Sequence, residues 1–211
     1  EDTRSECIKI FDEYLVPIAK KLSYQELITR SNIKAKPTVV FIGEPNSGVS
    51  SLIKELFSVD SDSSGNLSEI SIYINEQDSD SLNQNSIEDL GYDMSGSLLG
   101  DLDLVYKIVK TKSGLLKNMN IIGISHSDFS DSAHELQQSY HKLSSYFCST
   151  ADILVVVGKI LATDSFEFYK FLSQIREFIS SDKHLFVLNK IDRSSSVEEL
   201  IGKYGSFCWN I

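Results

Sequence analysis

Cysteine is scarce in this chain, and the few cysteines present are scattered. Cys7, Cys148 and Cys208 are the only three, an odd number at wide spacing. They form neither a metal-binding pattern nor a disulfide framework, which favours a reducing compartment. Long apolar runs are also missing: none approaches the roughly 20 residues that a membrane-spanning helix needs, so the sequence predicts no transmembrane segment.

Basic residues are outnumbered. The 211 residues include 20 Lys and Arg against 30 Asp and Glu, which gives a net charge of −10. This balance argues against nucleic acid as a partner. The length suits one well-buried domain. The opening residues EDTRSE lack both a Met and the apolar core of a signal peptide, so we expect a segment excised from a longer protein.

Apolar patterning predicts strands that alternate with helices. Short apolar runs predict strands at 38–42, 70–74, 119–125, 152–158 and 184–189. Helical spacing predicts helices at 4–22, 50–57, 99–109, 131–150 and 165–180. Pro17 should kink the first helix. A last helix is expected after Ser195 or Ser196, since each has a Glu three residues later, as in a capping box.

This alternation predicts an α/β fold, with a mainly parallel central sheet of about six strands and helices on both faces. We expect a helical lead-in over residues 1–35 and one domain over 36–211. Ser, Asp, Asn and Gly dominate residues 58–97, so a long mobile loop is expected there. The loop after the first strand should lie at the carboxyl edge of the sheet, where such folds bind ligands.

The stretch FIGEPNSGVSSLI, residues 41–53, has the spacing of a phosphate-binding loop but lacks its lysine. In such loops the glycines let backbone N–H groups surround a phosphate at a helix N-terminus. A Lys then supplies charge and a Ser or Thr binds magnesium, but here Val49 takes the place of the Lys. The candidate nucleotide-binding residues are Gly43, Ser47, Gly48, Ser50 and Ser51.

A second motif, Asn189-Lys190-x-Asp192, follows the last predicted strand. In nucleotide sites of this type the Asp accepts two hydrogen bonds from guanine, the Lys stem packs on the base, and the Asn braces the phosphate loop. Alone, the motif would fit a polar turn equally well. Together with a correctly spaced loop earlier in the chain, it indicates nucleotide-binding ancestry.

A third motif, Asp-x-x-Gly after the strand at 119–125, has lost both of its functional groups. The Asp normally supports magnesium through water and the Gly amide contacts the terminal phosphate, but the chain has Gly123 and His126. Loss of the Lys and Asp contacts would remove roughly 3–6 kcal/mol, or about 10²–10⁴ in affinity. Hydrolysis would suffer more, since its transition state depends on positioned charge.

The chain resembles the GTPase-fold domain of the EHD family, dynamin-like ATPases that carry a C-terminal EH domain. The resemblance rests on IFDEYLVPIAKKL (10–22), KPTVVFIGEPNSGVSSLI (36–53), FEFYKFLSQIREFISSDKHLFVLNKID (166–192) and YGSFCWNI (204–211). It extends nearly end to end, apart from about 59–118, where Leu67 and Ser68 stand at the family's Thr positions.

The resemblance implies a P-loop NTPase fold of the dynamin and EHD type. It also implies a homodimer with Trp209, the only Trp, at the contact; a core position is the alternative for a lone Trp. Because Val49, Gly123 and His126 replace the motif residues, we expect a pseudo-GTPase with no catalytic residues. It would bind nucleotide weakly or not at all and act as a dimerisation or scaffold module in membrane trafficking or remodelling.

The ligand and location are further expectations. No cofactor is expected; if nucleotide binding is retained, it would be ATP or GTP with Mg²⁺ on Ser50. Asp192 suits guanine, whereas the resemblance implies adenine. We expect a cytoplasmic protein peripheral to endosomal or vesicular membranes, attached through regions outside this sequence.

Two alternatives remain open. One is an active NTPase with a relocated cation, Lys54 or Arg193. The other is a protein of the endoplasmic reticulum lumen that resembles sarcalumenin and has a calcium-related role. The EF-hand-like run at 60–71 does not itself predict a calcium site, because its twelfth residue is Ser71 in place of the bidentate Glu.

Overall fold

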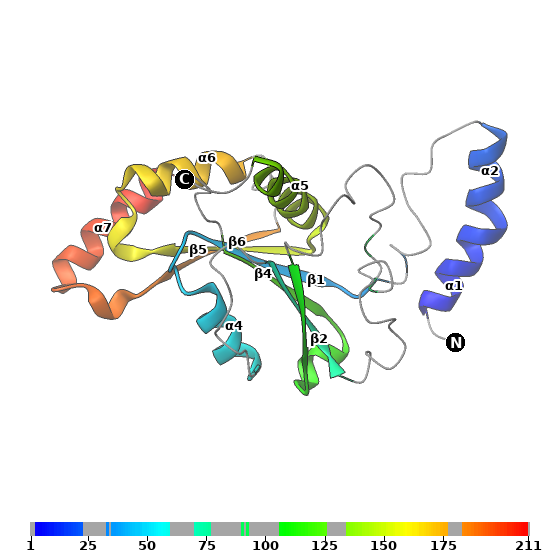
Figure 1. Ribbon diagram of the computed structural model, residues 1–211, viewed down its shortest axis with the longest axis horizontal. Coiled ribbons are helices and arrows are strands. Elements are labelled where there is room, and N and C mark those ends of the chain that lie inside the picture. Colours follow the sequence, from blue (N-terminus) through cyan, green and yellow to red (C-terminus); the bar gives the residue numbers. More distant parts are fainter. Residues whose placement is uncertain are drawn as a thin grey trace.

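The computed structural model describes residues 3–22, 33, 35–59, 70–76, 90, 92, 106–125, 134–176 and 183–210 (Figure 1). Its strands are β1 (Thr38–Gly43), β2 (Ile70–Asn75), β3 (Tyr106–Thr111), β4 (Asn120–Ser125), β5 (Ile153–Lys159) and β6 (His184–Asn189). Its α-helices are α1 (Thr3–Ile10), α2 (Val16–Lys21), α4 (Val49–Phe57), α5 (His134–Thr150), α6 (Phe166–Ile175) and α7 (Val197–Asn210). Short helical turns are η1 (Phe11–Leu15), η5 (Gly114–Lys117), η6 (Ile160–Ala162) and η8 (Ile191–Arg193).

The six strands form one sheet in the order β3-β2-β4-β1-β5-β6. β1 is parallel to its neighbours β4 and β5, and β6 is parallel to β5. β2 runs antiparallel to β4, and β3 is parallel to β2. Helices α5, α6 and α7 cover one face and α4 covers the other (Figure 1). The predicted α/β fold with a mainly parallel sheet is confirmed.

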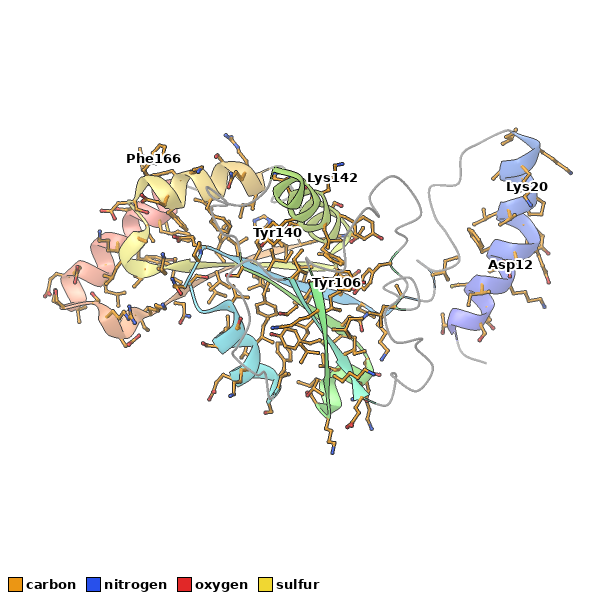
Figure 2. All side chains as sticks on the ribbon, in the orientation of Figure 1. Asp12, Lys20, Tyr106, Tyr140, Lys142 and Phe166 are labelled. Carbon is orange, nitrogen blue, oxygen red and sulfur yellow. The ribbon has the colours of Figure 1, made fainter. Side chains whose placement is uncertain are left out.

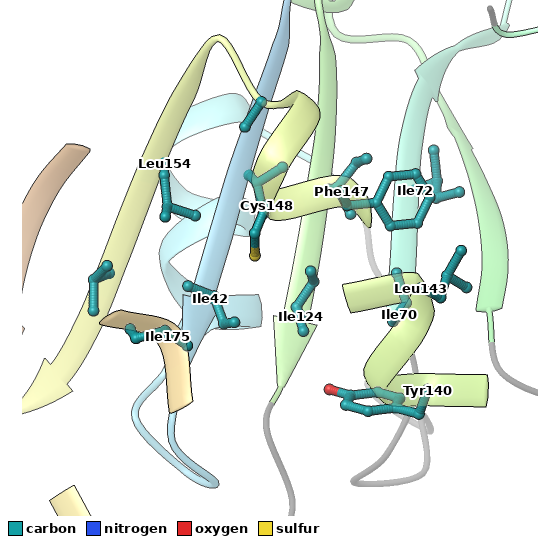
Figure 3. Close-up of a cluster of buried hydrophobic side chains, with 14 of the residues drawn as sticks. Ile42, Ile70, Ile72, Ile124, Tyr140, Leu143, Phe147, Cys148, Leu154 and Ile175 are labelled. Carbon is teal, nitrogen blue, oxygen red and sulfur yellow. The ribbon is translucent and has the colours of Figure 1, made fainter. Parts of the chain in front are cut away.

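The central strand β1 is apolar on both faces because helices pack against both. Val40 and Ile42 belong to the larger buried cluster, under α5 and α6 (Figure 3). Phe41 points the other way, into a smaller cluster that includes Val49 and Ile53 of α4. Burial of each such side chain contributes about 1.5–3 kcal/mol. β1 is therefore a rigid base for the loop that follows it.

One predicted helix is wrong. Within the range 99–109, residues 106–109 belong to strand β3, while Leu99 and Leu102 lie outside the described residues. The pairing of β3 with β2 decides the outcome: Tyr106 and Ile108 pack on the larger cluster, and Val109 packs on the smaller one. A period of two therefore describes these residues, and the helical spacing was coincidental.

The N-terminal helix spans the expected residues, and its hydrogen-bonding pattern changes just before Pro17. A π-helical turn, η1, connects α1 to α2 immediately before this residue. Pro17 has no N–H to donate, and a widened turn is a common way for a helix to absorb such a gap. Of the expected apolar face, Phe11 is buried while Leu15, Ile18 and Leu22 are exposed. The side chains of Asp12 and Lys20 also project from this helix (Figure 2).

A modified capping box starts α7. Ser196 Oγ accepts a hydrogen bond from Glu199 N at 3.2 Å, as an N-cap does. Glu199 Oε2 accepts from Ser195 N at 2.7 Å, one residue earlier than in the usual box. That backbone bond lowers the pKa of Glu199. Both predicted serines therefore take part in the cap.

Two buried residues, Leu90 and Tyr92, lie within the range expected to be a mobile loop. Tyr92 packs edge-on against Phe147, with ring centroids 5.3 Å apart. Its hydroxyl lies 2.8 Å from Thr38 Oγ1 and accepts from Asn120 Nδ2 at 3.2 Å. Burial raises the pKa of Tyr92. Tyr92 is therefore fixed where β1 and β4 begin.

We expect a Tyr92→Phe variant to lose about 1–3 kcal/mol of unfolding free energy, because Asn120 Nδ2 would lose its buried acceptor. Urea unfolding measures the loss. Tyr14→Phe is the matched control, since Tyr14 is exposed on η1, and should change stability by less than about 0.5 kcal/mol. Equal midpoints for the two variants would show that the Tyr92 hydroxyl contributes nothing.

Candidate functional site

The candidate loop, residues 44–48, connects the end of β1 to the start of α4 at the carboxyl edge of the sheet. Gly48 caps the helix with φ 95° and ψ 23°, a left-handed conformation that favours glycine. A Cβ on Gly48 would also collide with Asn189 Nδ2. In the first turn of the helix, Leu52 N donates to Gly48 O at 2.9 Å. The loop thus leads into a helix N-terminus, a geometry that suits anions.

Three side chains at the carboxyl ends of β5 and β6 hold the loop. Each donates to one of the successive carbonyl oxygens of residues 45–47. The bonds are Lys159 Nζ to Pro45 O at 3.3 Å, Lys190 Nζ to Asn46 O, and Asn189 Nδ2 to Ser47 O at 2.8 Å. We call Lys159, Asn189 and Lys190 the loop clamp. The protein's own groups therefore tie the backbone of the loop to the sheet.

The Asn-Lys-x-Asp turn is also fixed locally. Asn189 Oδ1 accepts from Lys190 N at 2.9 Å, which orients the amide, and Lys190 has a φ of 61°. Asp192 is exposed in the short turn η8. The structure thus brings Asn189 and Lys190 against the loop and leaves the carboxylate of Asp192 in solvent.

An ion pair links the loop to the end of β5. Glu44 is only 3% exposed, and its Oε2 lies 3.2 Å from Lys159 Nζ. Its second oxygen, Oε1, has no hydrogen-bond partner among the described residues, and the same holds for Ser47 Oγ. Burial raises the pKa of Glu44, and the ammonium of Lys159 opposes that rise. The loop therefore contains a carboxylate that is only half satisfied.

Two of the substituted motif positions, Val49 and Gly123, lie side by side. Val49 is 4% exposed and belongs to the smaller apolar cluster with Ile53 and Tyr73. A Cβ on Gly123 would lie 2.9 Å from Ile53 Cδ1 and 3.6 Å from Val49 Cγ1. Where the motifs would place a cation and a carboxylate, this chain has continuous apolar packing. His126 lies outside the described residues.

Of the remaining predicted residues, Gly43, Ser50 and Ser51 flank the loop, and Trp209 lies elsewhere. Gly43 ends β1, and Ser50 and Ser51 are exposed in the first turn of α4. Trp209 is not at the loop: it lies in the last turn of α7 and is 90% exposed. The alternative of a core tryptophan is therefore wrong.

The residues present do not fit a magnesium nucleotide in the usual way. Ser50 offers a hydroxyl, but Val49 brings no charge and Gly123 no carboxylate. Glu44 adds a negative charge where phosphates would need positive ones. Within the described ranges, no group of three His, Cys, Asp or Glu side chains could hold a metal ion. We therefore derive no reaction step through a bound nucleotide.

Sequence reasoning missed Glu44 and Lys159. Glu44 stood inside the candidate loop as a non-motif residue. Lys159 ends the otherwise apolar strand ILVVVGK, where a single charge signals the carboxyl edge of the sheet. Their pairing could not be predicted, because the lysine and the loop lie far apart in the sequence.

Three features indicate the class of fold. They are the central strand β1, the loop at its carboxyl end and the Asn-Lys-x-Asp turn after β6. The fold is that of a dynamin-like P-loop GTPase domain. No protein-family model matches the chain, and no curated protein matches it.

Two solved structures resemble nearly the whole chain. One is an oligomerised bacterial dynamin pair described as a mechanism for the long-range sensing and tethering of membranes. It aligns with a TM-score of 0.54 and 15% identity, over 99% of this chain and 34% of that one. The other is SsGBP in complex with GDP, with a TM-score of 0.46 and 18% identity, over 95% of this chain and 47% of that one. The chain spans less than half the length of either protein. The likeness to the bacterial dynamin supports the fold and nothing beyond the fold.

Proposed function

We propose that this chain is a pseudo-GTPase: a dynamin-like GTPase-fold domain that binds nucleotide weakly or not at all and does not hydrolyse it efficiently. The observation that carries the proposal is the buried apolar cluster of Val49, Ile53 and Tyr73, against which the Gly123 position lies. A lysine and a carboxylate at these sites would stabilise phosphate and magnesium, and apolar packing does neither. The buried carboxylate of Glu44 weakens phosphate binding further.

The retained function is that of a dimerisation or scaffold module. A dimerisation surface depends on the shape of its apolar side chains. It can therefore be kept when the residues that bind phosphate are lost. The resemblance to the EHD family supports a role in membrane trafficking or remodelling, on the cytoplasmic side of endosomal or vesicular membranes. No helix in the part of the chain that the structure describes is long and apolar enough to cross a bilayer.

An active NTPase with a relocated cation is the second candidate. Lys159 and Lys190 favour it, because both ammonium groups already lie at the loop. Lys54 suits the role less well, since it lies in the last turn of α4, away from the helix N-terminus. In the observed geometry both clamp lysines donate to loop carbonyls, and Lys159 also pairs with Glu44, so both ammonium groups are already engaged. Of the EF-hand-like run at 60–71, residues 60–69 lie outside the described residues, and the luminal, calcium-related alternative stays a hypothesis.

Nucleotide binding tests the proposal directly. Purified protein should release no stoichiometric adenine or guanine nucleotide on denaturation. Calorimetry with Mg·ATP and Mg·GTP should give no low-micromolar dissociation constant. Ser50→Ala is the matched control: it removes the one motif hydroxyl that could ligate magnesium, and should leave the wild-type result unchanged. Low-micromolar binding that Ser50→Ala abolishes would establish the NTPase alternative.

We expect the chain to form a homodimer through the exposed surface of α7. Trp209 is 90% exposed there, and Val197, Ile201 and Tyr204 are exposed on the same helix. Exposed aromatic and aliphatic groups of this kind mark interaction surfaces, and Trp is enriched at their centres. Trp209→Ala should shift the light-scattering mass from dimer to monomer while the circular dichroism stays near native.

Two controls sharpen this test. Leu56→Ala changes an apolar side chain that is 55% exposed on α4, on the other face of the sheet, and should leave the dimer intact. Cys208 is exposed next to Trp209. In a Cys7→Ser background a bismaleimide should therefore link two copies, and Trp209→Ala should abolish the link. A wild type that is monomeric at high concentration would refute the assignment.

A further inference from the structure

The loop retains one part of an anion site, a left-handed glycine at a helix N-terminus, but it lacks the motif lysine. Its left-handed Gly48 leads into α4, a helix of nine residues whose N-terminus favours negative ligands. The clamp lysines add two positive charges at its carbonyls. This combination should attract phosphate even without the motif lysine, unless another group opposes it.

Glu44 is that opposing group. It is the loop's own carboxylate, 3% exposed, and it pairs with the ammonium of Lys159 at 3.2 Å. The pairing cancels the charge that Lys159 would otherwise offer. Among the described residues of the loop, residues 44–48, Glu44 is the only acid.

The unpartnered atoms of the loop give a second, independent indication. Glu44 Oε1 and Ser47 Oγ are both buried without a hydrogen-bond partner in the described part of the chain. Ser47 is 1% exposed. Such orphaned groups are unfavourable and call for an explanation. A glutamine would accept the same bond from Lys159 without burying a charge, so stability alone does not account for a glutamate here.

We propose that Glu44 determines the ligand specificity of the loop: its buried carboxylate neutralises Lys159 and makes an otherwise competent anion loop reject phosphate. The inference rests on the proposed function, because it explains how a loop of this shape stays without nucleotide. Two causes then weaken phosphate binding by the loop. One is the missing motif lysine, and the other is the negative charge of Glu44, which a single substitution removes. The ligand class that the released loop accepts is a polyphosphate, bound by the helix N-terminus and Lys159.

The test uses inorganic pyrophosphate without metal, measured by calorimetry at low salt. Glu44→Gln keeps the size of the side chain and a bond acceptor for Lys159 but removes the charge. We expect it to bind pyrophosphate roughly 10- to 100-fold more tightly than the wild type, as one unit charge in a partly buried site would produce. The gain should fall as salt rises.

Two further variants separate the explanations. Glu55→Gln makes the same change of net charge at an exposed position of α4 and should give no gain. Glu44→Gln combined with Lys159→Met should lose the gain, because the released charge is that of Lys159. Glu44→Ala repeats the test should the Gln variant fold poorly, with circular dichroism as the check in each case.

The outcomes are distinct. Equal pyrophosphate affinity for Glu44→Gln and Glu55→Gln would overturn the inference while leaving the pseudo-GTPase proposal intact. A gain that persists without Lys159 would also overturn it, since another cation would then be responsible. Tight nucleotide binding by the wild type would instead defeat the proposed function, and the comparison of Glu44→Gln with Glu55→Gln would still measure the effect of the loop carboxylate.

Discussion

A Gly123→Asp variant, which restores a motif residue, should lose roughly 3–5 kcal/mol of unfolding free energy. The new Cβ would lie 2.9 Å from Ile53 Cδ1, and the carboxylate beyond it would enter the apolar cluster around Val49 and Tyr73. None of the described residues in that cluster carries a positive charge that could pair with it. Urea unfolding at neutral pH measures the loss, and nucleotide binding should not appear.

Two controls divide this effect into its parts. Gly123→Ala adds only the Cβ and should cost about 1–3 kcal/mol through crowding. Gly205→Asp adds the same charge on α7, where a new Cβ meets nothing within 4 Å, and should cost no more than about 1 kcal/mol. If Gly123→Asp were as stable as Gly205→Asp, the position would still open into a polar site, and the apolar-packing argument for a pseudo-GTPase would fail.

The adjacency of Val49 and Gly123 also explains why the two losses occur together. A lysine beside a glycine, or an aspartate beside a valine, would each leave one buried charge without a partner. Replacing the motif Lys by Val49 and the motif Asp by Gly123 removes the two charges together. A double variant, Val49→Lys with Gly123→Asp, should therefore be less destabilised than the sum of its single variants, since the new charges are neighbours.

Much of the fold could be read from the sequence, because local patterns determined it. β1, β4, β5 and β6 are apolar runs that are buried on both faces or end at recognisable motifs. α5 and α6 show apolar residues at helical spacing, and the structure buries Tyr140, Phe147 and Phe168 as that spacing requires. The helical spacing of apolar residues gave a wrong prediction at β3. Tyr106 and Val109 are three residues apart there, but they face opposite sides of a strand.

The candidate site was less predictable because long-range contacts define it. Motif spacing located the loop and the Asn-Lys-x-Asp turn, and the structure joins them through Asn189 and Ser47. No local pattern could join Glu44 to Lys159, because sheet order alone places β5 beside β1. Sequence motifs show which groups have been lost from a site, whereas the new partners of the remaining groups appear only in three dimensions.

We expect Lys159→Met to be among the most destabilising single changes in the loop region, at roughly 3–5 kcal/mol at neutral pH. The variant removes the only ion-pair partner of Glu44 among the described residues and leaves its carboxylate 3% exposed and unpaired. It also frees Pro45 O from its donor. The 30% exposure of Lys159 does not soften this effect, because the buried member of the pair is the one left behind.

The pH dependence distinguishes this cause from simple loss of packing. Burial raises the pKa of Glu44 above that of an unfolded Glu. The folded state therefore binds the proton more tightly, and stability falls as pH rises from the unfolded towards the folded pKa. Without Lys159 the folded pKa should rise further, so the deficit of Lys159→Met against wild type should shrink as the pH is lowered from 7 towards 5.

Matched variants complete the argument about Lys159. Lys142→Met removes an exposed lysine from α5 and should change stability by less than about 0.5 kcal/mol at any pH. Lys159→Arg keeps a donor and a charge and should recover most of the loss. Lys159→Met combined with Glu44→Gln removes the unpaired charge and should be more stable than Lys159→Met alone. A deficit that stays constant with pH and survives in the double variant would mean that Lys159 acts through its aliphatic stem, and the ion pair would then have no part in holding the loop.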